Sequence, residues 1–199
     1  MMIFMRIKKY IFYIKLLIFL FIKLNFSVNF VKEFCIKRLK NSPTDYYARF
    51  LLAELFRSEG NNAEAVDQYK KLVTNGFRNA KVVYGLALSS FREQIYDESQ
   101  SYFKSLLEMN FNNKVALDHL GRIDLIKNNC RKSIMYFEQS LKLDPKDQLI
   151  LTNIAYCYYE IGDYEKSYEV CQRAFELNQS SELAKDMNVA KQALERERT

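Results

Sequence analysis

The chain has 199 residues, 49% hydrophobic and 27% charged, a balance typical of a soluble globular protein with a sizeable core. Only five Gly and two Pro are present, which argues against a many-turned β fold and favours long helices. The net charge of +6 comes from residues 1–45, which hold nine basic and two acidic residues, whereas residues 46–199 hold 21 and 22. A near-neutral body lacks the clustered basic surface that nucleic-acid binding needs.

The first 27 residues have the layout of a secretory signal or a membrane anchor. Arg6, Lys8 and Lys9 stand ahead of an apolar stretch that contains an unbroken run from Leu16 to Ile22. A positively charged start followed by an apolar run of this length is typical of a signal sequence. We therefore expect residues 1–27 to direct the protein to a membrane or to export, with the basic side chains near anionic lipid headgroups.

A second interpretation of this segment stays open. Lys15 and Lys23 interrupt the apolar stretch, and a lysine deep in a bilayer costs about 2.5–3.5 kcal/mol. No A-x-A-like cleavage site follows the stretch, and the nearest small residue is Ser27. On this alternative, residues 12–25 form the first helix of an incomplete repeat and the protein is cytoplasmic.

Residues 28–45 fit the second half of such a repeat. Pro43 and Pro145 are the only prolines, and they stand 102 residues apart, which is three times the 34-residue period described next. Pro43 therefore has the exit position of a repeat that would begin near Phe12, with its second helix at residues 30–40. Because Phe19 would occupy a position that needs a small residue, we interpret residues 28–45 as a degenerate half-repeat.

Residues 46–181 form four uninterrupted units of 34 residues: 46–79, 80–113, 114–147 and 148–181. Counting the first residue of each unit as phase 1, small residues recur at phases 8 and 20, a turn-forming residue at phase 15 and an aromatic at phase 24. Several residue classes recurring in register predict a helical repeat array. Phase 8 holds Ala53, Ala87, Gly121 and Ala155; phase 15 holds Gly60, Gln94, Asn128 and Gly162; phase 20 holds Ala65, Ser99, Ser133 and Ser167; phase 24 holds Tyr69, Phe103, Phe137 and Cys171.

This pattern resembles the tetratricopeptide repeat, which has a 34-residue period and the order small residue, Ala, aromatic, Pro. The fourth unit shows it best, with LTNIAYCYYEIGDYEKSYEVCQRAFELN, and the third ends in LKLDPKD. The resemblance implies an all-α, right-handed superhelical solenoid built of antiparallel helix pairs, with a helix A and a helix B in each unit. Three kinds of departure occur: Phe77, Phe111 and Gln179 replace Pro at phase 32, and Cys171 replaces the aromatic at phase 24. In helix A, Ser90 and Asp124 stand where the family usually has an aromatic or large apolar residue.

The residue types suit their phases. Small side chains at phases 8 and 20 let helices A and B approach closely, and larger ones there would cost about 1–3 kcal/mol by overpacking. The phase 24 aromatic is expected to fill the space between repeats. The phase 15 residue is expected to end helix A in a left-handed conformation, which Gly adopts readily and Gln94 least well.

Residues 182–199 predict a C-terminal capping helix. Leu183, Met187, Ala190 and Leu194 recur at helical spacing with charged residues between them. A repeat array needs such a helix, with one polar face, to cover its last apolar surface.

The resemblance also implies a protein-binding scaffold. In this family, phases 2, 5, 9 and 12 of helix A line a concave groove, and aromatics with scattered charges there suit an extended peptide or a partner helix. The alternatives are that some aromatics only pack between neighbouring helices, or that a membrane-associated adaptor binds partners through its convex face or N-terminal segment. The corresponding residues are Tyr47, Phe50, Glu54, Arg57, Lys81, Tyr84, Leu88, Phe91, Val115, Asp118, Arg122, Leu125, Leu149, Thr152, Tyr156 and Tyr159.

The sequence offers little for catalysis, cofactors or RNA. His119 is the only histidine, so no His-based metal site or triad can be assembled, and no glycine-rich phosphate loop is present. Cys35, Cys130, Cys157 and Cys171 form no C-x-x-C pair, and we expect buried free thiols. Related two-helix repeats can bind RNA, but no repeat phase here forms a basic stripe. The expected partner is therefore a protein, without cofactor, metal or small-molecule substrate.

The two interpretations of residues 1–27 predict different fates for the protein. If the segment is a signal or anchor, the full-length protein is expected to sediment with membranes or to be exported, whereas a version starting at Ser27 stays in the soluble cytosolic fraction. Cell fractionation followed by immunoblotting separates the two. Identical soluble cytosolic behaviour of both versions would assign residues 12–25 to a repeat helix.

Overall fold

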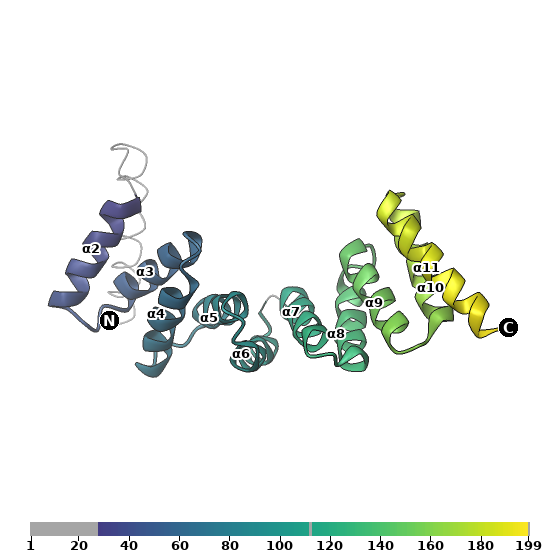
Figure 1. Ribbon diagram of the computed structural model, residues 1–199. Helices are drawn as coiled ribbons and strands as arrows, with labels where there is room; N and C mark the ends of the chain where they lie inside the picture. Colours follow the sequence, from purple (N-terminus) through teal and green to yellow (C-terminus); the bar gives the residue numbers. More distant parts are fainter. Residues whose placement is uncertain (1–27, 112, 199) are drawn as a thin grey trace. The chain divides into compact units, whose positions relative to one another are not determined.

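The computed structural model describes residues 28–111 and 113–198, so the predicted signal or anchor at residues 1–27 lies outside the described residues (Figure 1). The described residues are helical throughout, without a strand. This confirms the predicted all-α fold class. No helix in this part of the chain is both long enough and apolar enough to cross a bilayer.

The chain divides into two compact units, Met1–Ile95 and Tyr96–Thr199. In each unit, every helix packs against the next one along the chain. The first unit contains α2 (Val28–Asn41), α3 (Tyr46–Ser58), α4 (Asn62–Thr74) and α5 (Ala80–Arg92). The second contains α6 (Tyr96–Glu108), α7 (Asn113–Ile126), α8 (Cys130–Leu143), α9 (Gln148–Glu160), α10 (Tyr164–Leu177) and α11 (Ser181–Glu197).

Close approach of helix A to helix B occurs where small residues were predicted. In the second compact unit, the Ser133 hydroxyl of α8 donates to the Gly121 carbonyl of α7 at 2.8 Å. The Ser167 hydroxyl of α10 donates to the Ala155 carbonyl of α9 at 2.9 Å. A short side chain on helix B thus reaches the backbone of helix A, and both hydroxyls are satisfied in the core.

The aromatic residues at phase 24 fill the space left by this close approach. Tyr69, Phe103 and Phe137 are fully buried. A Cβ added at Gly121 would lie 2.5 Å from the Phe137 ring, and one added at Gly85 would lie 2.3 Å from the Tyr69 ring. Such distances are shorter than any van der Waals contact, so an aromatic ring occupies the place of a side chain at both glycines.

The residues at phase 15 lie just after the C-terminal end of each helix A and adopt the conformation that ends the helix. Gly60, Gln94, Asn128 and Gly162 all have positive φ, between 58° and 82°, as predicted for phase 15. After Gly162, the Asp163 N–H donates to the Tyr158 carbonyl at 2.9 Å, and the other three turns make the same bond. This is the Schellman arrangement, which satisfies carbonyl groups at the end of helix A.

The same arrangement accounts for two of the missing prolines. At the end of α4, Gly76 has a φ of 80°, and the Phe77 N–H donates to the Leu72 carbonyl at 2.9 Å. Asn110 and Phe111 repeat this geometry after α6. A left-handed residue at phase 31 stops helix B in these repeats, whereas the third repeat has Asp144 there with a φ of −145° and Pro145 at phase 32.

The ends of the described chain also contain helices, as predicted. α2 packs against α3. α11 packs against α10, with Leu183 and Ala190 buried and Met187 and Leu194 half-buried.

All four cysteines are free thiols in the structure. Cys35, Cys157 and Cys171 are buried, and Cys130 is half-buried. Burial, aided by the nearby Asp45 carboxylate, raises the pKa of the Cys35 thiol to about 11.

The strained turn at Gln94 gives a stability prediction. Gln94→Gly is expected to raise the free energy of unfolding by about 1 kcal/mol, because glycine has no Cβ to strain at a φ of 60°. The reciprocal Gly162→Gln is expected to lower it by a similar amount. Urea denaturation followed by circular dichroism measures both. Gln139→Gly, in the middle of α8, is the matched control, and it should be destabilising by about 1 kcal/mol. Destabilisation by Gln94→Gly would contradict the argument.

Candidate partner-binding surface

The residues predicted to line a groove share one stripe of each helix A. We call this stripe the A-face: phases 2, 5, 9 and 12 of α3, α5, α7 and α9. The neighbouring phases 3, 4, 7 and 8 supply core residues, such as Leu151, Ile154 and Ala155 on α9. None of the sixteen A-face residues is fully buried. Each of the two compact units therefore presents partly exposed A-faces.

On α3, the A-face side chains mostly contact their own unit. The Tyr47 ring meets the Phe77 ring edge-on at 5.9 Å between centroids, and the Phe50 ring meets Tyr69 in the same way at 6.3 Å. Arg57 pairs with the Glu54 carboxylate at 2.6 Å. These contacts support the alternative in which some A-face aromatics serve mainly as packing.

The Glu54 carboxylate also accepts a hydrogen bond from the Tyr69 hydroxyl. Burial of the phenol and the Glu54 carboxylate together raise the pKa of Tyr69. The side-chain hydrogen bond to Glu54 also raises the pKa of Arg57. Tyr69 and Arg57 therefore keep their usual protonation states, and Glu54 is engaged inside the unit rather than open to a partner.

On α5, Lys81 is exposed, and Tyr84, Leu88 and Phe91 are half-buried. Gly85 lies between them on the helix and gives the Tyr69 ring of α4 its space. Gly85 is at phase 6 of its repeat, which is not one of the two phases where small residues recur. Its close approach to Tyr69 became visible only in the packed structure.

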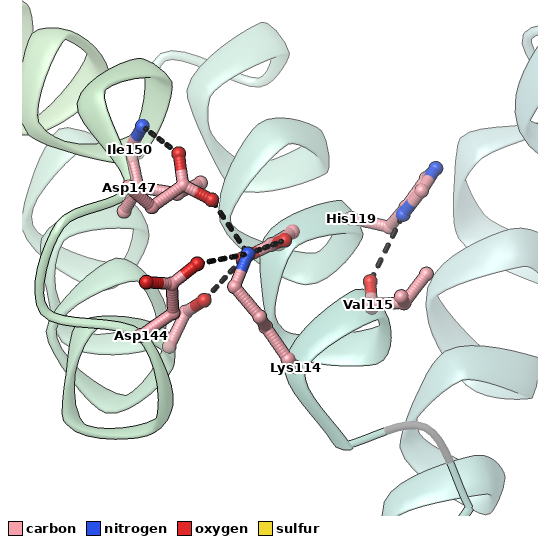
Figure 2. Close-up of polar contacts among 8 residues, drawn as sticks. Lys114, Val115, His119, Asp144, Asp147 and Ile150 are labelled. Atoms are coloured by element: carbon pink, nitrogen blue, oxygen red, sulfur yellow. Dashed lines mark hydrogen bonds and ion pairs between the residues drawn. The ribbon is translucent and has the colours of Figure 1, made fainter.

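On α7, Asp118 belongs to an ion cluster around Lys114 (Figure 2). The Lys114 Nζ lies 2.5 Å from an Asp147 carboxylate oxygen, 3.2 Å from Asp118 and 3.8 Å from Asp144. Asp118 also accepts a hydrogen bond from the Ser140 hydroxyl of α8. Asp118 is thus committed to holding α7, α8 and the turn before α9 together, whereas Arg122 on the same face is exposed.

Asp147 has a second role in this cluster. Its other carboxylate oxygen accepts from the Ile150 N–H at 3.1 Å and caps the start of α9 (Figure 2). Burial opposes ionisation of Asp147, but the hydrogen bonds from Lys114 and the backbone outweigh it and lower the pKa of this carboxyl. Burial likewise opposes the charge on Lys114, yet Asp147 and Asp118 raise its pKa. Both groups are therefore charged at neutral pH.

His119 is built into packing. Its ring stacks on the Phe103 ring, with centroids 4.6 Å apart, and its Nδ1 lies 2.9 Å from the Val115 carbonyl oxygen (Figure 2). Residues 28–111 and 113–198 contain no group of three His, Cys, Asp or Glu side chains placed to hold a metal ion.

On α9, the A-face is the most open. Tyr156 is 53% exposed and Leu149 is 63% exposed. Tyr159 is half-buried and meets the Tyr164 ring edge-on at 5.3 Å. A cleft of about 410 Å³ opens beside Tyr156 and Tyr159. Its lining residues come from α9, α10 and α11: Thr152, Asn153, Ala155, Tyr156, Tyr159, Glu160, Ser167, Cys171, Asp186 and Val189.

Family comparison supports this architecture. Models described as tetratricopeptide repeat match residues 37–80 and 136–169. The chain is a tetratricopeptide-repeat protein. A crystal structure of MamA superposes with a TM-score of 0.69 at 18% identity, over 74% of this chain and 81% of that one. YrrB, described as a TPR protein with an unusual peptide-binding site, superposes with a TM-score of 0.68 at 16% identity, over 81% and 84%. At these identities the likeness concerns the fold.

Two curated proteins have similar sequences. BBSome complex member BBS4 of Bos taurus is 21% identical over 110 residues, which are 55% of this chain and 21% of that protein. Anaphase-promoting complex subunit 3 of Schizosaccharomyces pombe is 22% identical over 149 residues, which are 74% of this chain and 22% of that protein. This tetratricopeptide-repeat chain therefore spans about a fifth of the length of the curated relatives it matches.

Sequence reasoning did not find two features of this tetratricopeptide-repeat protein. One is the Lys114 cluster, although the acidic residues Asp144 and Asp147 before a helix are a recognisable capping signal. The other is the cleft on α9, α10 and α11. The replacement of an aromatic by Cys171 was the available sign, because a smaller side chain leaves space where the other repeats have a ring.

The Lys114 cluster gives a pH-dependent prediction. Lys114→Met is expected to lower the free energy of unfolding by about 1 kcal/mol at neutral pH, a value discounted for the partial exposure of the charges. The pKa of Asp147 is below its ordinary 3.8 in the folded protein, so its contribution is present above pH 3.8 and is lost as pH falls towards the folded value. Without Lys114, that acid-induced loss should become shallower.

Urea denaturation between pH 2 and pH 7 measures both effects. Lys191→Met is the matched control, because Lys191 pairs only loosely with Glu195, at 4.0 Å between exposed side chains. Equal losses in the two variants, or an unchanged acid slope in Lys114→Met, would contradict the role given to the cluster.

Proposed function

We propose that this chain is a non-catalytic scaffold that binds an extended peptide or a helix of a partner protein on its A-faces. One observation carries the proposal: α9 exposes Leu149 and Tyr156 to more than half of their surface, and Tyr156 lines a cleft. Large apolar side chains around a concavity are the usual anchors of protein interfaces.

Charge supports a protein partner over nucleic acid. Residues 46–199 carry 21 basic and 22 acidic residues, and α9 has Glu160 but no basic residue. A phosphate backbone would meet little attraction on this surface. The relatives are consistent with a protein partner as well, since two are described as members or subunits of complexes and YrrB as having a peptide-binding site.

Not all A-face residues contribute equally in this proposal. Asp118 and Arg57 are held by ion pairs within their units, and Tyr47 and Phe50 by aromatic packing. In this proposal the anchoring residues are Tyr156 and Leu149 of α9, and Tyr159 lies on the same A-face. Lys81 and Arg122 are the exposed residues of the A-faces of α5 and α7. Binding through helix B is the competing possibility, because α8 exposes Met135 by 60%.

The two faces can be compared within one unit. A photo-reactive benzoylphenylalanine at position 156 is expected to cross-link a partner in cells, and the same group at position 135 is not. Tyr156→Ala should then weaken binding of that purified partner by about thirtyfold, which corresponds to about 2 kcal/mol. Isothermal titration calorimetry measures the affinity, and circular dichroism checks that helicity is kept.

Met135→Ala is the matched control, because it removes a similarly exposed apolar side chain from helix B of the third repeat, within the same compact unit. It should leave the affinity within about twofold of the original, as most interface-distant truncations do. Loss of affinity in Met135→Ala with full binding by Tyr156→Ala would move the site to the helix B face and overturn the A-face proposal.

A further inference from the structure

The fourth repeat lacks the ring that fills the other three. Tyr69, Phe103 and Phe137 are fully buried at phase 24. The fourth unit has the smaller Cys171 there, and the cleft of about 410 Å³ includes Cys171, Ala155 and Ser167 in its lining. The cleft therefore borders the position where the family would place an aromatic side chain. Its volume is within the range of sites that bind ligands, about 300–1,000 Å³.

The walls of the cleft are aromatic and apolar. Tyr156 and Tyr159 line it from α9, and Val189, which is half exposed, lines it from α11. Together with Ala155 and Cys171 they form a surface against which the methylene stem of a long side chain can pack. The faces of tyrosine rings also attract cations, especially the planar guanidinium group.

Two carboxylates stand at the same cleft. Glu160 lies on α9 and Asp186 on α11, and both side chains are exposed. Neither makes an ion pair with any residue in 28–111 or 113–198. No lysine, arginine or histidine lines the cleft. The lining of this cleft therefore carries two negative side chains and no positive one, which complements a cation on a partner. Arg131 and Lys132 share a separate hollow with Glu160, outside this lining.

Neighbouring groups show the direction in which these charges act. The Glu160 carboxylate raises the pKa of the Tyr156 phenol, and Asp186 adds to the effect of burial in raising the pKa of the Cys171 thiol to about 11. The charge of Glu160 is thus felt at Tyr156, and the charge of Asp186 is felt at Cys171.

We propose that this cleft binds an arginine side chain of a partner protein, with the stem packed between Tyr156 and Val189 and the guanidinium held by Glu160 and Asp186. The inference rests on the proposed scaffold function and names the chemistry that one part of the A-face recognises. An arginine fits better than an aromatic side chain because the two carboxylates would otherwise stay beside an apolar ligand. It fits better than lysine because the guanidinium group is planar, stacks on aromatic rings and donates to two carboxylates in fixed directions.

The test uses the full chain and a small probe, N-acetyl-arginine amide, titrated at low ionic strength. Saturable ¹⁵N chemical-shift changes are expected at Tyr156, Tyr159 and Val189, with a Kd of about 1 mM. N-acetyl-leucine amide and N-acetyl-glutamine amide should give at least about tenfold weaker binding, which is the effect of 1.4 kcal/mol. Equal shifts with the leucine probe, or no saturation by the arginine probe at about 20 mM, twenty times the expected Kd, would overturn the proposal.

Two variants separate the parts of the site. Glu160→Gln/Asp186→Asn is expected to weaken arginine binding by about fivefold, which corresponds to about 1 kcal/mol and is in the range of exposed charge pairs. Glu169→Gln/Glu182→Gln is the matched control, since it removes the same charge from exposed positions of α10 and α11 outside the lining. Equal effects of the two double variants would mean that Glu160 and Asp186 contribute only through the general charge of the surface. That outcome would contradict the proposed arginine site.

Filling the cleft gives an independent readout. Cys171→Phe restores the family residue and is expected to abolish the shifts caused by the arginine probe while raising the melting temperature. If Cys171→Phe is folded and still binds the probe, the cleft is not the site. The outcome is distinct from that of the cross-linking experiment: a partner that cross-links at position 156 but shows no arginine preference refutes only this inference, and leaves the A-face proposal standing.

Discussion

The close approach of helix A to helix B is the constraint on which the rest of the structure depends. Where phases 8 and 20 face each other, a short side chain of helix B reaches the backbone of helix A, as the Ser133 hydroxyl does when it donates to the Gly121 carbonyl. This proximity leaves no room for a second side chain, so the aromatic at phase 24 takes the adjoining space. The Phe137 ring lies so near Gly121 that a Cβ there would be 2.5 Å away. The positions of small and large residues are therefore linked, and each is meaningful only with the other.

The same link explains the cleft in the fourth repeat. Ala155 and Ser167 keep the close approach, with a hydroxyl-to-carbonyl distance of 2.9 Å, so the backbone scaffold is unchanged. Only the filling side chain differs, because Cys171 is much smaller than the rings at Tyr69, Phe103 and Phe137. The two helices keep their spacing through their other contacts, while the side chain at phase 24 is smaller. A cavity therefore forms at this position instead of a collapsed core. The Cys171 substitution therefore changes the surface of α9 without changing the repeat.

Polar contacts divide the A-face into structural and open parts. Lys114 binds three aspartates and joins α7 to the turn before α9, and this takes Asp118 out of the set of freely available groups. Glu54 does the same for Arg57 on α3. Tyr156 and Leu149 have no comparable commitment to the core, as their exposure shows. Residues at equivalent phases of the A-faces therefore differ in whether they are available to a partner.

The sequence by itself determined the helical repeat, its period and the conformation of its turns. These features depend on residue type and local spacing: small residues at phases 8 and 20 permit contact, and Gly60, Gly162, Asn128 and Gln94 all take the left-handed conformation expected at phase 15. Repetition makes such local signals reliable, because each is seen four times.

Only the tertiary structure decided which A-face side chains are open and where a cleft lies. Asp118 and Tyr156 occupy equivalent stripes of α7 and α9, yet one is held by Lys114 and Ser140 and the other is exposed. Lys114 is only four positions from Asp118 on α7, but Ser140 is 22 positions away and reaches Asp118 only after α7 and α8 pack. Periodicity predicts the direction of a side chain, but its availability depends on the length and charge of neighbours brought together by folding.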